Sequence, residues 1–312
     1  MKTQALLYDA AGHDRQVDDL AKLDPSELGS EQLLWVDVSE FGEGQVHGLP
    51  PHLPISEVSL EELDSLQIFD DHYRFAIGLH DQGGSKLGFV VGKTWLLTLS
   101  KTRPQFFDEF VEADRGETLK GKMSPTALMA TLLIKQLEVF RKEVASVDNA
   151  IDKLDETILR SREKRTPLGA LAVLRRRVAG LRTGLGDQRA VIHSLIGPDF
   201  FAHVGSADQA FLVETNRVFE RMEDDVNRAR DTVIGSFELY ASRVAQDTNQ
   251  LLKALTIVTV ITGIVGAVAG VFGMNFDTSI PHTGMNGFLV VTGTMLITSV
   301  ALVAVAIWRR WI

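Results

Sequence analysis

The chain has 312 residues, no cysteine and a formal net charge of −9 at pH 7. The lack of cysteine excludes disulfide bonds and thiolate metal sites, and the negative charge argues against a nucleic-acid partner. The mean hydropathy of +0.06 is ordinary for a globular protein, but the apolar residues concentrate at the C-terminus. The opening residues, MKTQALLYDAAGHDRQ, lack the apolar stretch of a signal peptide, so we expect the N-terminal region to be cytoplasmic.

Residues 1 to 120 have the pattern of a compact cytoplasmic α/β domain. Four short runs are typical of β-strands, namely ALLYDA, LLWVDV, YRFAIGLH and LGFVVGKTWLLTLS. Glycine, proline and paired aspartates fall between these runs, as expected for turns. The stretch SEVSLEELDSLQIF and the segment 104–114 have helical patterns instead.

Residues 121 to 250 predict a long helical stalk. Helices are expected over about 126–163 and 168–196, and a third begins near Asp208. Apolar residues of this third helix recur every three or four positions, at Phe219, Met222, Val226, Ala229, Val233, Phe237, Tyr240 and Val244. A continuous helix over 208–275 would be roughly 100 Å long, too long for one globular domain. Its apolar stripe therefore needs neighbouring helices, from the same chain or from other subunits.

Residues 251 to 312 predict two transmembrane helices, at about 252–274 and 287–308. No charged side chain occurs over 254–276 or 288–308, and each run approaches the roughly 20 residues that cross a bilayer. Two buried core helices of a soluble protein are the weaker interpretation, because such helices rarely stay uncharged for so long. Lys253, Arg309 and Arg310 flank the two spans, while their connecting loop has no basic residue. We therefore expect a multi-pass protein of the cell inner membrane with both termini in the cytoplasm.

The first apolar run ends in a short motif, Gly273-Met274-Asn275, and is preceded by TNQLLKALTI over 248–257. This pattern resembles the CorA family of divalent metal-ion transporters, whose signature is Gly-Met-Asn at the end of the first of two C-terminal transmembrane helices. The resemblance implies an α+β membrane protein with a cytoplasmic α/β domain, a helical stalk and two transmembrane helices. It also implies a funnel-shaped homopentamer that has the lipid bilayer and divalent cations as its other partners, and no resident cofactor.

In this family resemblance, Gly273, Met274 and Asn275 form the selectivity filter. Mg²⁺ gives up its water reluctantly, so a ring of Asn275 amides and Gly273 carbonyls would contact the water shell of the ion. The alternative interpretation is a helix C-cap in which asparagine adopts a left-handed turn.

The resemblance also implies a set of pore-lining residues on one face of the first transmembrane helix, spaced three or four apart: Asn249, Leu252, Leu255, Thr259, Gly263, Gly266 and Gly270. Leu252 and Leu255 would form a hydrophobic constriction, and Asn249 a polar ring at the cytoplasmic end. Alternatively, Gly266 and Gly270 form a small-xxx-small pair that only allows close helix packing.

The loop FDTSIPHTGMNGF departs from many magnesium-transporting members, which carry a Met-Pro-Glu-Leu stretch here, and looks closer to the ZntB-like zinc branch. A ring of Asp277 would concentrate cations at the external entrance, and His282 is a residue type that binds zinc or protons, although a lone loop histidine is usually a surface residue. We expect transport of hydrated Mg²⁺, with Co²⁺ and Ni²⁺ as further ions. The alternatives are a Zn²⁺ transporter, proton-coupled or not, and a poorly conducting membrane-anchored scaffold or sensor. No motif supports an enzyme.

The charge lies outside the predicted spans. The first 250 residues hold 29 basic and 40 acidic residues, a net charge of −11, which would attract cations to a cytoplasmic vestibule. By the same resemblance, regulatory Mg²⁺ or Zn²⁺ would bind between subunits. Candidate ligands are Glu214, Glu220, Asp224 and Asp225 on the stalk and Glu61, Glu62 and Asp64 in the N-terminal domain. The alternative for such acidic runs is a solvated helix face.

Overall fold

The computed structural model describes residues 2–20, 23–40, 53, 60–79, 85–112, 118–160, 167–273 and 284–308. By internal packing the chain forms two compact units, Met1–Leu154 with Thr166–Gly235 and Asp155–Arg165 with Ser236–Ile312. The first unit combines a β-sheet with most of the stalk helices, and the second contains the apolar C-terminal helices. The sequence-based boundaries near residues 120 and 250 follow composition and stay predictions.

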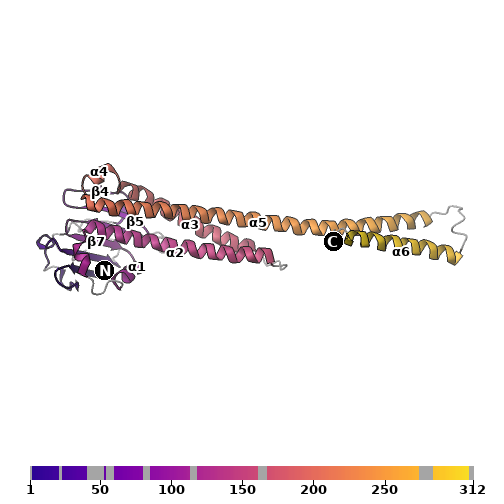
Figure 1. The fold of residues 1–312 in the computed structure, drawn as a ribbon, viewed down its shortest axis with the longest axis horizontal. Helices are drawn as coiled ribbons and strands as arrows, with labels where there is room; N and C mark the ends of the chain where they lie inside the picture. Colours follow the sequence, from indigo (N-terminus) through magenta and orange to yellow (C-terminus); the bar gives the residue numbers. More distant parts are fainter. Residues whose placement is uncertain are drawn as a thin grey trace. The chain divides into compact units, whose positions relative to one another are not determined.

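A mixed sheet lies at one end of the first unit, at the left in Figure 1. Its seven strands are β1 (Lys2–Asp9), β2 (Arg15–Gln16), β3 (Gln32–Ser39), β4 (Gln67–Ile68), β5 (Tyr73–Gly78), β6 (Lys86–Val91) and β7 (Trp95–Ser100). They are ordered β2-β1-β3-β7-β6-β5-β4, and only β3 and β7 pair in parallel. The single apolar run at 87–100 is a hairpin, because the chain turns between Gly92 and Trp95. A Cβ at Gly92 would lie 2.3 Å from the Trp95 indole, so a larger residue here would have to displace that ring.

Both faces of the sheet are buried, which explains why the strands read as almost continuous apolar runs. One face holds a core that includes Leu34, Val36 and Leu97 and receives Leu60 from η3 (Leu60–Glu62). On the other face, Trp35 packs edge-on against Phe107 and Phe110 of α1 (Gln105–Glu112). Two short 3₁₀ turns, η2 (Pro25–Glu27) and η4 (Thr118–Lys122), complete the domain.

The helix expected over SEVSLEELDSLQIF is wrong in its described part. Only the three residues of η3 are helical, and Gln67–Ile68 is a strand. Leu63 is buried and its carbonyl accepts a hydrogen bond from the Ala76 amide at 2.8 Å, while Gln67 pairs with Arg74. Pairing with β5 thus satisfies the backbone groups that an isolated helix would have satisfied internally.

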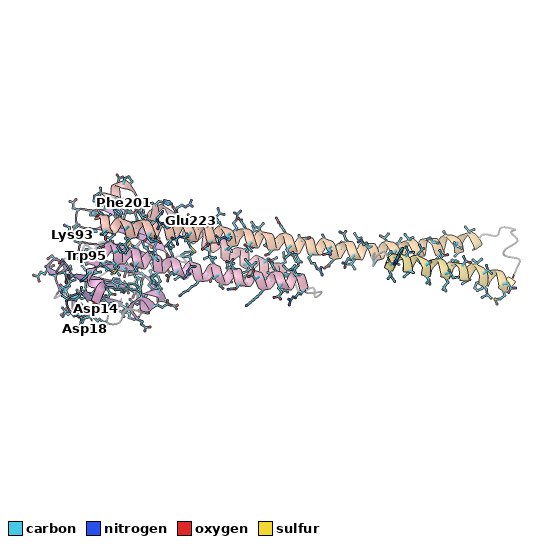
Figure 2. The ribbon with its side chains drawn as sticks, viewed as in Figure 1. Asp14, Asp18, Lys93, Trp95, Phe201 and Glu223 are labelled. Carbon is cyan, nitrogen blue, oxygen red and sulfur yellow. The ribbon has the colours of Figure 1, made fainter. Side chains whose placement is uncertain are left out.

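Four further helices follow, α2 (Pro125–Arg160), α3 (Pro167–Ser194), α4 (Pro198–Phe201) and α5 (Ser206–Gly273). Within the first unit, α2, α3 and the start of α5 run side by side (Figure 1). Arg177 of α3 pairs with Glu143 of α2 at 2.7 Å, and Arg189 of α3 pairs at 2.7 Å with Glu223 of α5. Glu223 is labelled in Figure 2. The predicted apolar stripe of α5 is buried from Phe219 to Val233, and so serves this three-helix packing.

Two buried glutamines connect the sheet to these helices. Gln136 of α2 and Gln188 of α3 both donate a side-chain hydrogen bond to the Gly78 carbonyl at the end of β5, at 3.3 and 2.8 Å. Both side chains come from residues that are at most 2% exposed. The Gly78 carbonyl therefore fixes the positions of α2 and α3 relative to the sheet.

We expect the two glutamines to act on stability non-additively. Either Gln136→Leu or Gln188→Leu leaves one donor to the Gly78 carbonyl, whereas the double variant leaves none. The double variant should lose about 1–2 kcal/mol more than the sum of the single losses. Urea unfolding of the full-length protein in detergent measures this coupling. Additive losses of unfolding free energy would show that the two glutamines do not share the Gly78 carbonyl as an acceptor.

Candidate ion pathway

The second unit contains two helices that are long and apolar enough to cross a membrane. One is the C-terminal part of α5, which continues the stalk helix without a break, and the other is α6 (Gly284–Trp308). No proline interrupts α5 between Ser206 and Gly273, so its backbone hydrogen bonds are satisfied within the helix, as an apolar environment requires.

One face of α5 packs against α6. Its less exposed positions are spaced three or four apart, at Ala254, Ile257, Ile261, Val265 and Val268. An apolar hollow between the helices is lined by Ile264, Val265 and Val268 of α5 and by Val290, Val291, Thr294, Met295 and Thr298 of α6. The two helices therefore use these faces for each other.

The seven residues predicted to line a pore lie on the opposite face of α5. At 100° per residue they cluster about half a turn away from the positions that pack on α6. All seven are exposed, including Leu252 at 53% and Leu255 at 61%. A Cβ at Gly263, Gly266 or Gly270 would meet no atom within 4 Å. Gly266 and Gly270 thus do not serve the packing of α5 on α6, and this stripe is uncovered in the single subunit.

Thr259 and Asn249 place oxygen acceptors along this stripe, and the Asn249 amide also carries N–H donors. Thr259 donates its hydroxyl hydrogen to the Leu255 carbonyl at 2.9 Å, so the Thr259 oxygen presents only lone pairs to its surroundings. Further toward the N-terminus, Asn249 lies in a polar hollow of α5 with Ser242, Gln246 and Lys253. Oxygen acceptors of this kind suit the water shell of a hard cation.

Gly273 is the last residue of α5, exposed and with open space at its Cβ position. The other predicted filter residues, Met274 and Asn275, lie outside the described residues, as do Asp277 and His282 of the loop. The filter and the loop roles stay predictions.

The acidic residues predicted to hold regulatory cations do not converge. Glu214 pairs with Arg217 at 2.6 Å and Arg221 at 3.3 Å, and Asp225 pairs with Arg228 at 2.9 Å. Elsewhere, Glu220 accepts a hydrogen bond from Asn216, Asp64 pairs with Lys86, Glu61 and Glu62 lie on η3, and Asp224 is exposed. Within the described ranges, no three His, Cys, Asp or Glu residues could together hold a metal ion. A cation site built from them would need ligands from a second subunit.

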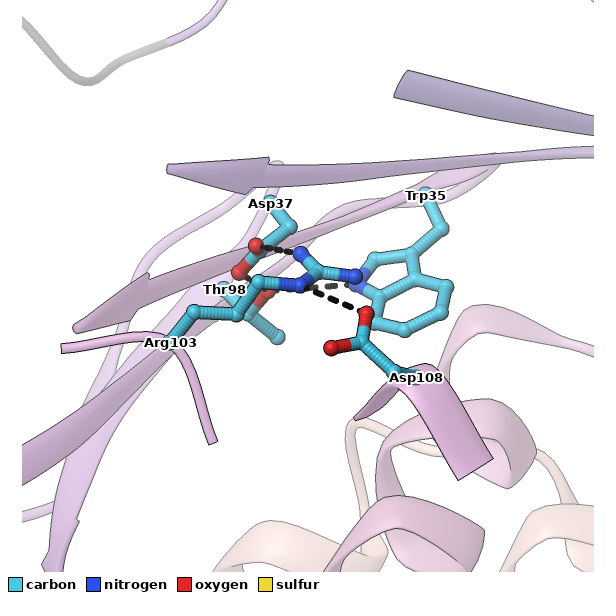
Figure 3. Close-up of polar contacts among 5 residues, drawn as sticks. All are labelled: Trp35, Asp37, Thr98, Arg103 and Asp108. Atoms are coloured by element: carbon cyan, nitrogen blue, oxygen red, sulfur yellow. Dashed lines mark hydrogen bonds and ion pairs between the residues drawn. The ribbon is translucent and has the colours of Figure 1, made fainter. Parts of the chain in front are cut away.

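A buried ion-pair network escaped the sequence analysis (Figure 3). Asp37 on β3 is 3% exposed and pairs with Arg103, whose Nε also donates to Asp108 of α1 at 3.1 Å. The Thr98 hydroxyl donates to Asp37 at 2.8 Å and accepts from the Trp35 indole at 3.1 Å. Burial raises the pKa of Asp37, against the lowering effect of the Arg103 guanidinium. An aspartate within the apolar run LLWVDV was the available signal.

Comparison with known proteins covers both units. Residues 72–310 match the family described as CorA-like Mg²⁺ transporter protein. The Cobalt/magnesium transport protein CorA of Thermotoga maritima is 23% identical over 279 residues, which span 86% of this chain and 78% of that protein. The complete structure of the CorA magnesium transporter from Methanocaldococcus jannaschii has a TM-score of 0.69 at 17% identity, over 100% of both chains. The full-length CmaX protein has a TM-score of 0.65 at 18% identity, over 99% of this chain and 97% of that one.

Proposed function

The chain belongs to the CorA-like Mg²⁺ transporter family, and from this premise we propose that it conducts a hydrated divalent cation across a membrane. The proposed first substrate is Mg²⁺, with Co²⁺ and Ni²⁺ as further ions. The observation that carries the proposal is the uncovered stripe of α5, which runs from Asn249 to Gly270 and lies opposite the face that packs on α6.

The pathway in this proposal lies on the axis of a homopentamer. One subunit has two candidate spans, which cannot enclose an aqueous path, so closure requires copies arranged around an axis normal to the membrane. The uncovered stripe of each copy then faces the axis. Leu252 and Leu255 form the narrow apolar constriction, and Thr259 offers an acceptor above it.

Glycine suits the remainder of the path for a physical reason. Mg²⁺ holds its water shell tightly, so a path that carries the hydrated ion must stay wide and must not replace the shell with charged ligands. Gly263, Gly266 and Gly270 leave that width, and a neutral filter of Gly273, Met274 and Asn275 contacts the water without trapping the ion.

Charge and topology complete the proposal. Both termini lie in the cytoplasm of an inner-membrane protein, and the net charge of −11 on the first 250 residues concentrates cations at the inner mouth. We further propose that regulatory Mg²⁺ or Zn²⁺ binds between subunits, where acidic residues of two copies can combine.

Zn²⁺ is the second candidate substrate, and the loop FDTSIPHTGMNGF favours it. This loop offers Asp277 and His282 and lacks the Met-Pro-Glu-Leu stretch. Imidazole is a good zinc ligand and accepts protons near neutral pH, which would link Zn²⁺ movement to a proton gradient.

The deciding experiment is cation flux into liposomes that contain the purified protein, with Mg²⁺ and Zn²⁺ compared at equal and at unequal pH. Mg²⁺ entry that ignores the pH gradient and is lost in Asn275→Ala supports the proposed channel. Zn²⁺ entry that rises with an inward proton gradient assigns the protein to the zinc branch. Absence of flux for both ions contradicts transport and leaves a scaffold or sensor.

A further inference from the structure

Helix α3 is basic in an otherwise acidic chain. Its sequence, PLGALAVLRRRVAGLRTGLGDQRAVIHS, holds five arginines and a single aspartate, whereas the whole chain has a net charge of −9. The buried side of α3 is apolar and includes Leu174, Leu181 and Leu185. The arginines therefore lie on the sides that α3 does not use for the core.

Within the described residues, two of these arginines have partners and three make no hydrogen bond or ion pair. Arg177 and Arg189 pair with Glu143 and Glu223. Arg175, Arg176 and Arg182, here called the arginine strip, are exposed and make no hydrogen bond or ion pair within the described part of the chain. They lie within about 11 Å along the helix, comparable to the screening length at physiological salt, so their charges repel one another until an anionic partner binds.

Small residues lie between and beyond these long side chains on the exposed surface of α3. Ala179, Gly180, Thr183 and Gly186 are all exposed, and a Cβ at Gly180 or Gly186 would meet no atom within 4 Å. A glycine inside a helix costs about 1 kcal/mol relative to alanine, and no packing within the subunit offsets that cost. Small residues beside long arginines allow another helix to approach closely while the guanidinium groups reach around it.

A complementary surface lies on α2. This helix faces α3 with Glu143 and Ser146, which both accept hydrogen bonds from Arg177. The flank of α2 away from these contacts carries Asp148 and Asp152, one helical turn apart, and is here called the aspartate flank. Both residues are exposed and make no hydrogen bond or ion pair in the described ranges.

The aspartate flank has an excess of negative charge. Partial burial, and then the neighbouring carboxylates of Asp152 and Asp225, raise the pKa of Asp148, while Arg228 opposes this. Arg228, which lowers the pKa of Asp148, also pairs with Asp225 at 2.9 Å, so its charge is shared among several carboxylates. The two charges of the flank are opposite in sign to those of the arginine strip and lie about 6 Å apart along the helix, within the length of about 11 Å that the strip spans.

We propose that the arginine strip of one subunit docks on the aspartate flank of a neighbouring copy of this chain. The proposal rests on the assembly described under the proposed function. The strip and the flank are different patches of one subunit, so the contact is heterologous, which is the kind that closes into a ring. An anionic membrane could also attract arginines, but the lengthwise strip with its small residues fits a helix, and the aspartate flank is present in every copy.

Charge exchange in the full-length protein tests this contact. Arg176→Glu with Arg182→Glu should raise the protein concentration at which the assembly dissociates in detergent by about ten-fold or more, and Asp148→Lys with Asp152→Lys should do the same. Combining all four changes should restore the assembly. Arg160→Glu is the control, because it reverses an exposed arginine of α2 that already pairs with Glu156. Light scattering measures the mass of the oligomer. If the variant with all four changes does not assemble again, the proposal is overturned.

Cross-linking provides a second readout that does not require dissociation. The chain has no cysteine, so Arg176→Cys and Asp152→Cys introduce a unique thiol pair. A bifunctional reagent should produce a ladder of covalent oligomers. An assembly that stays intact but gives no ladder contradicts the contact. A thiol at position 176 that is protected from the reagent only in nanodiscs with anionic lipid contradicts it as well. Neither readout uses ion flux, so a ladder in a protein that carries no Mg²⁺ would reject the proposed function and keep the docking.

Discussion

Gly266→Leu should lower Mg²⁺ flux by about ten-fold or more while leaving the protein folded and assembled. A Cβ at Gly266 meets no atom within 4 Å in the subunit, so a leucine there does not disturb α5 or its packing on α6. In a ring, each copy would place this side chain on the axis, where the added apolar bulk narrows the path and repels water. Flux into liposomes, with the oligomer mass as a check on assembly, measures the effect.

Ala304→Leu is the matched control for this substitution. It adds a leucine at an exposed position of α6, within the second candidate span, so its bulk should extend into lipid and leave flux unchanged. Equal flux in the Gly266→Leu variant and the wild type would show that the uncovered stripe of α5 does not line the path. Equal losses in both variants would point to a general effect on membrane insertion.

Arg103→Met should destabilise the protein by about 3–5 kcal/mol, because it leaves Asp37 as an unpaired charge in the sheet core. The side chains of Arg103 and Asp37 are 12% and 4% exposed, so water cannot replace the lost guanidinium. Urea unfolding of the full-length protein, followed by tryptophan fluorescence, measures the loss. Arg189→Met, which removes an exposed guanidinium, is the control and should leave stability nearly unchanged.

The pH dependence of this loss has a defined sign. The guanidinium lowers the pKa of Asp37, so its removal leaves burial to raise that pKa further above the ordinary aspartate value. Between the two pKa values, Asp37 of the folded variant holds a proton that the unfolded chain has already lost. The loss in free energy of unfolding relative to the wild type is therefore largest at neutral pH, and it shrinks as the pH falls toward about 4. Adding Asp37→Asn should recover part of the stability at neutral pH. A deficit independent of pH would contradict the assigned role of the Asp37 charge.

The described structure confirms the features that depend on long or repeated patterns. The uninterrupted helix through the stalk and the first apolar run follows from the lack of proline and from apolar residues every three or four positions. By contrast, SEVSLEELDSLQIF has a helical pattern of its own, and its backbone pairs with β5 only because residues farther along the chain form that strand. Local pattern cannot include a partner that is distant in sequence.

For the candidate pathway, the residues were predictable but their surroundings were not. Spacing alone places Leu252, Leu255 and Gly266 on one face of a helix, and the Gly-Met-Asn signature indicates the family. Whether that face is covered depends on where α6 packs, and the structure shows that α6 takes the opposite face. The network of Asp37 and Arg103 depends likewise on the parallel pairing of β3 with β7, which brings together residues 66 positions apart.

The family of this protein could be predicted from residue order alone, because hydrophobic run length, charge placement and the motif that ends the first apolar run are local properties. Which side chains have partners became known from the packed helices and sheet. The tertiary structure separates Arg177 and Arg189, which are paired, from Arg175, Arg176 and Arg182 of the same helix, which have no ion pair among the residues that the structure describes. The physical reason is that ion pairs and burial act over a few ångströms, and such distances between remote residues exist only after the helices and the sheet have packed.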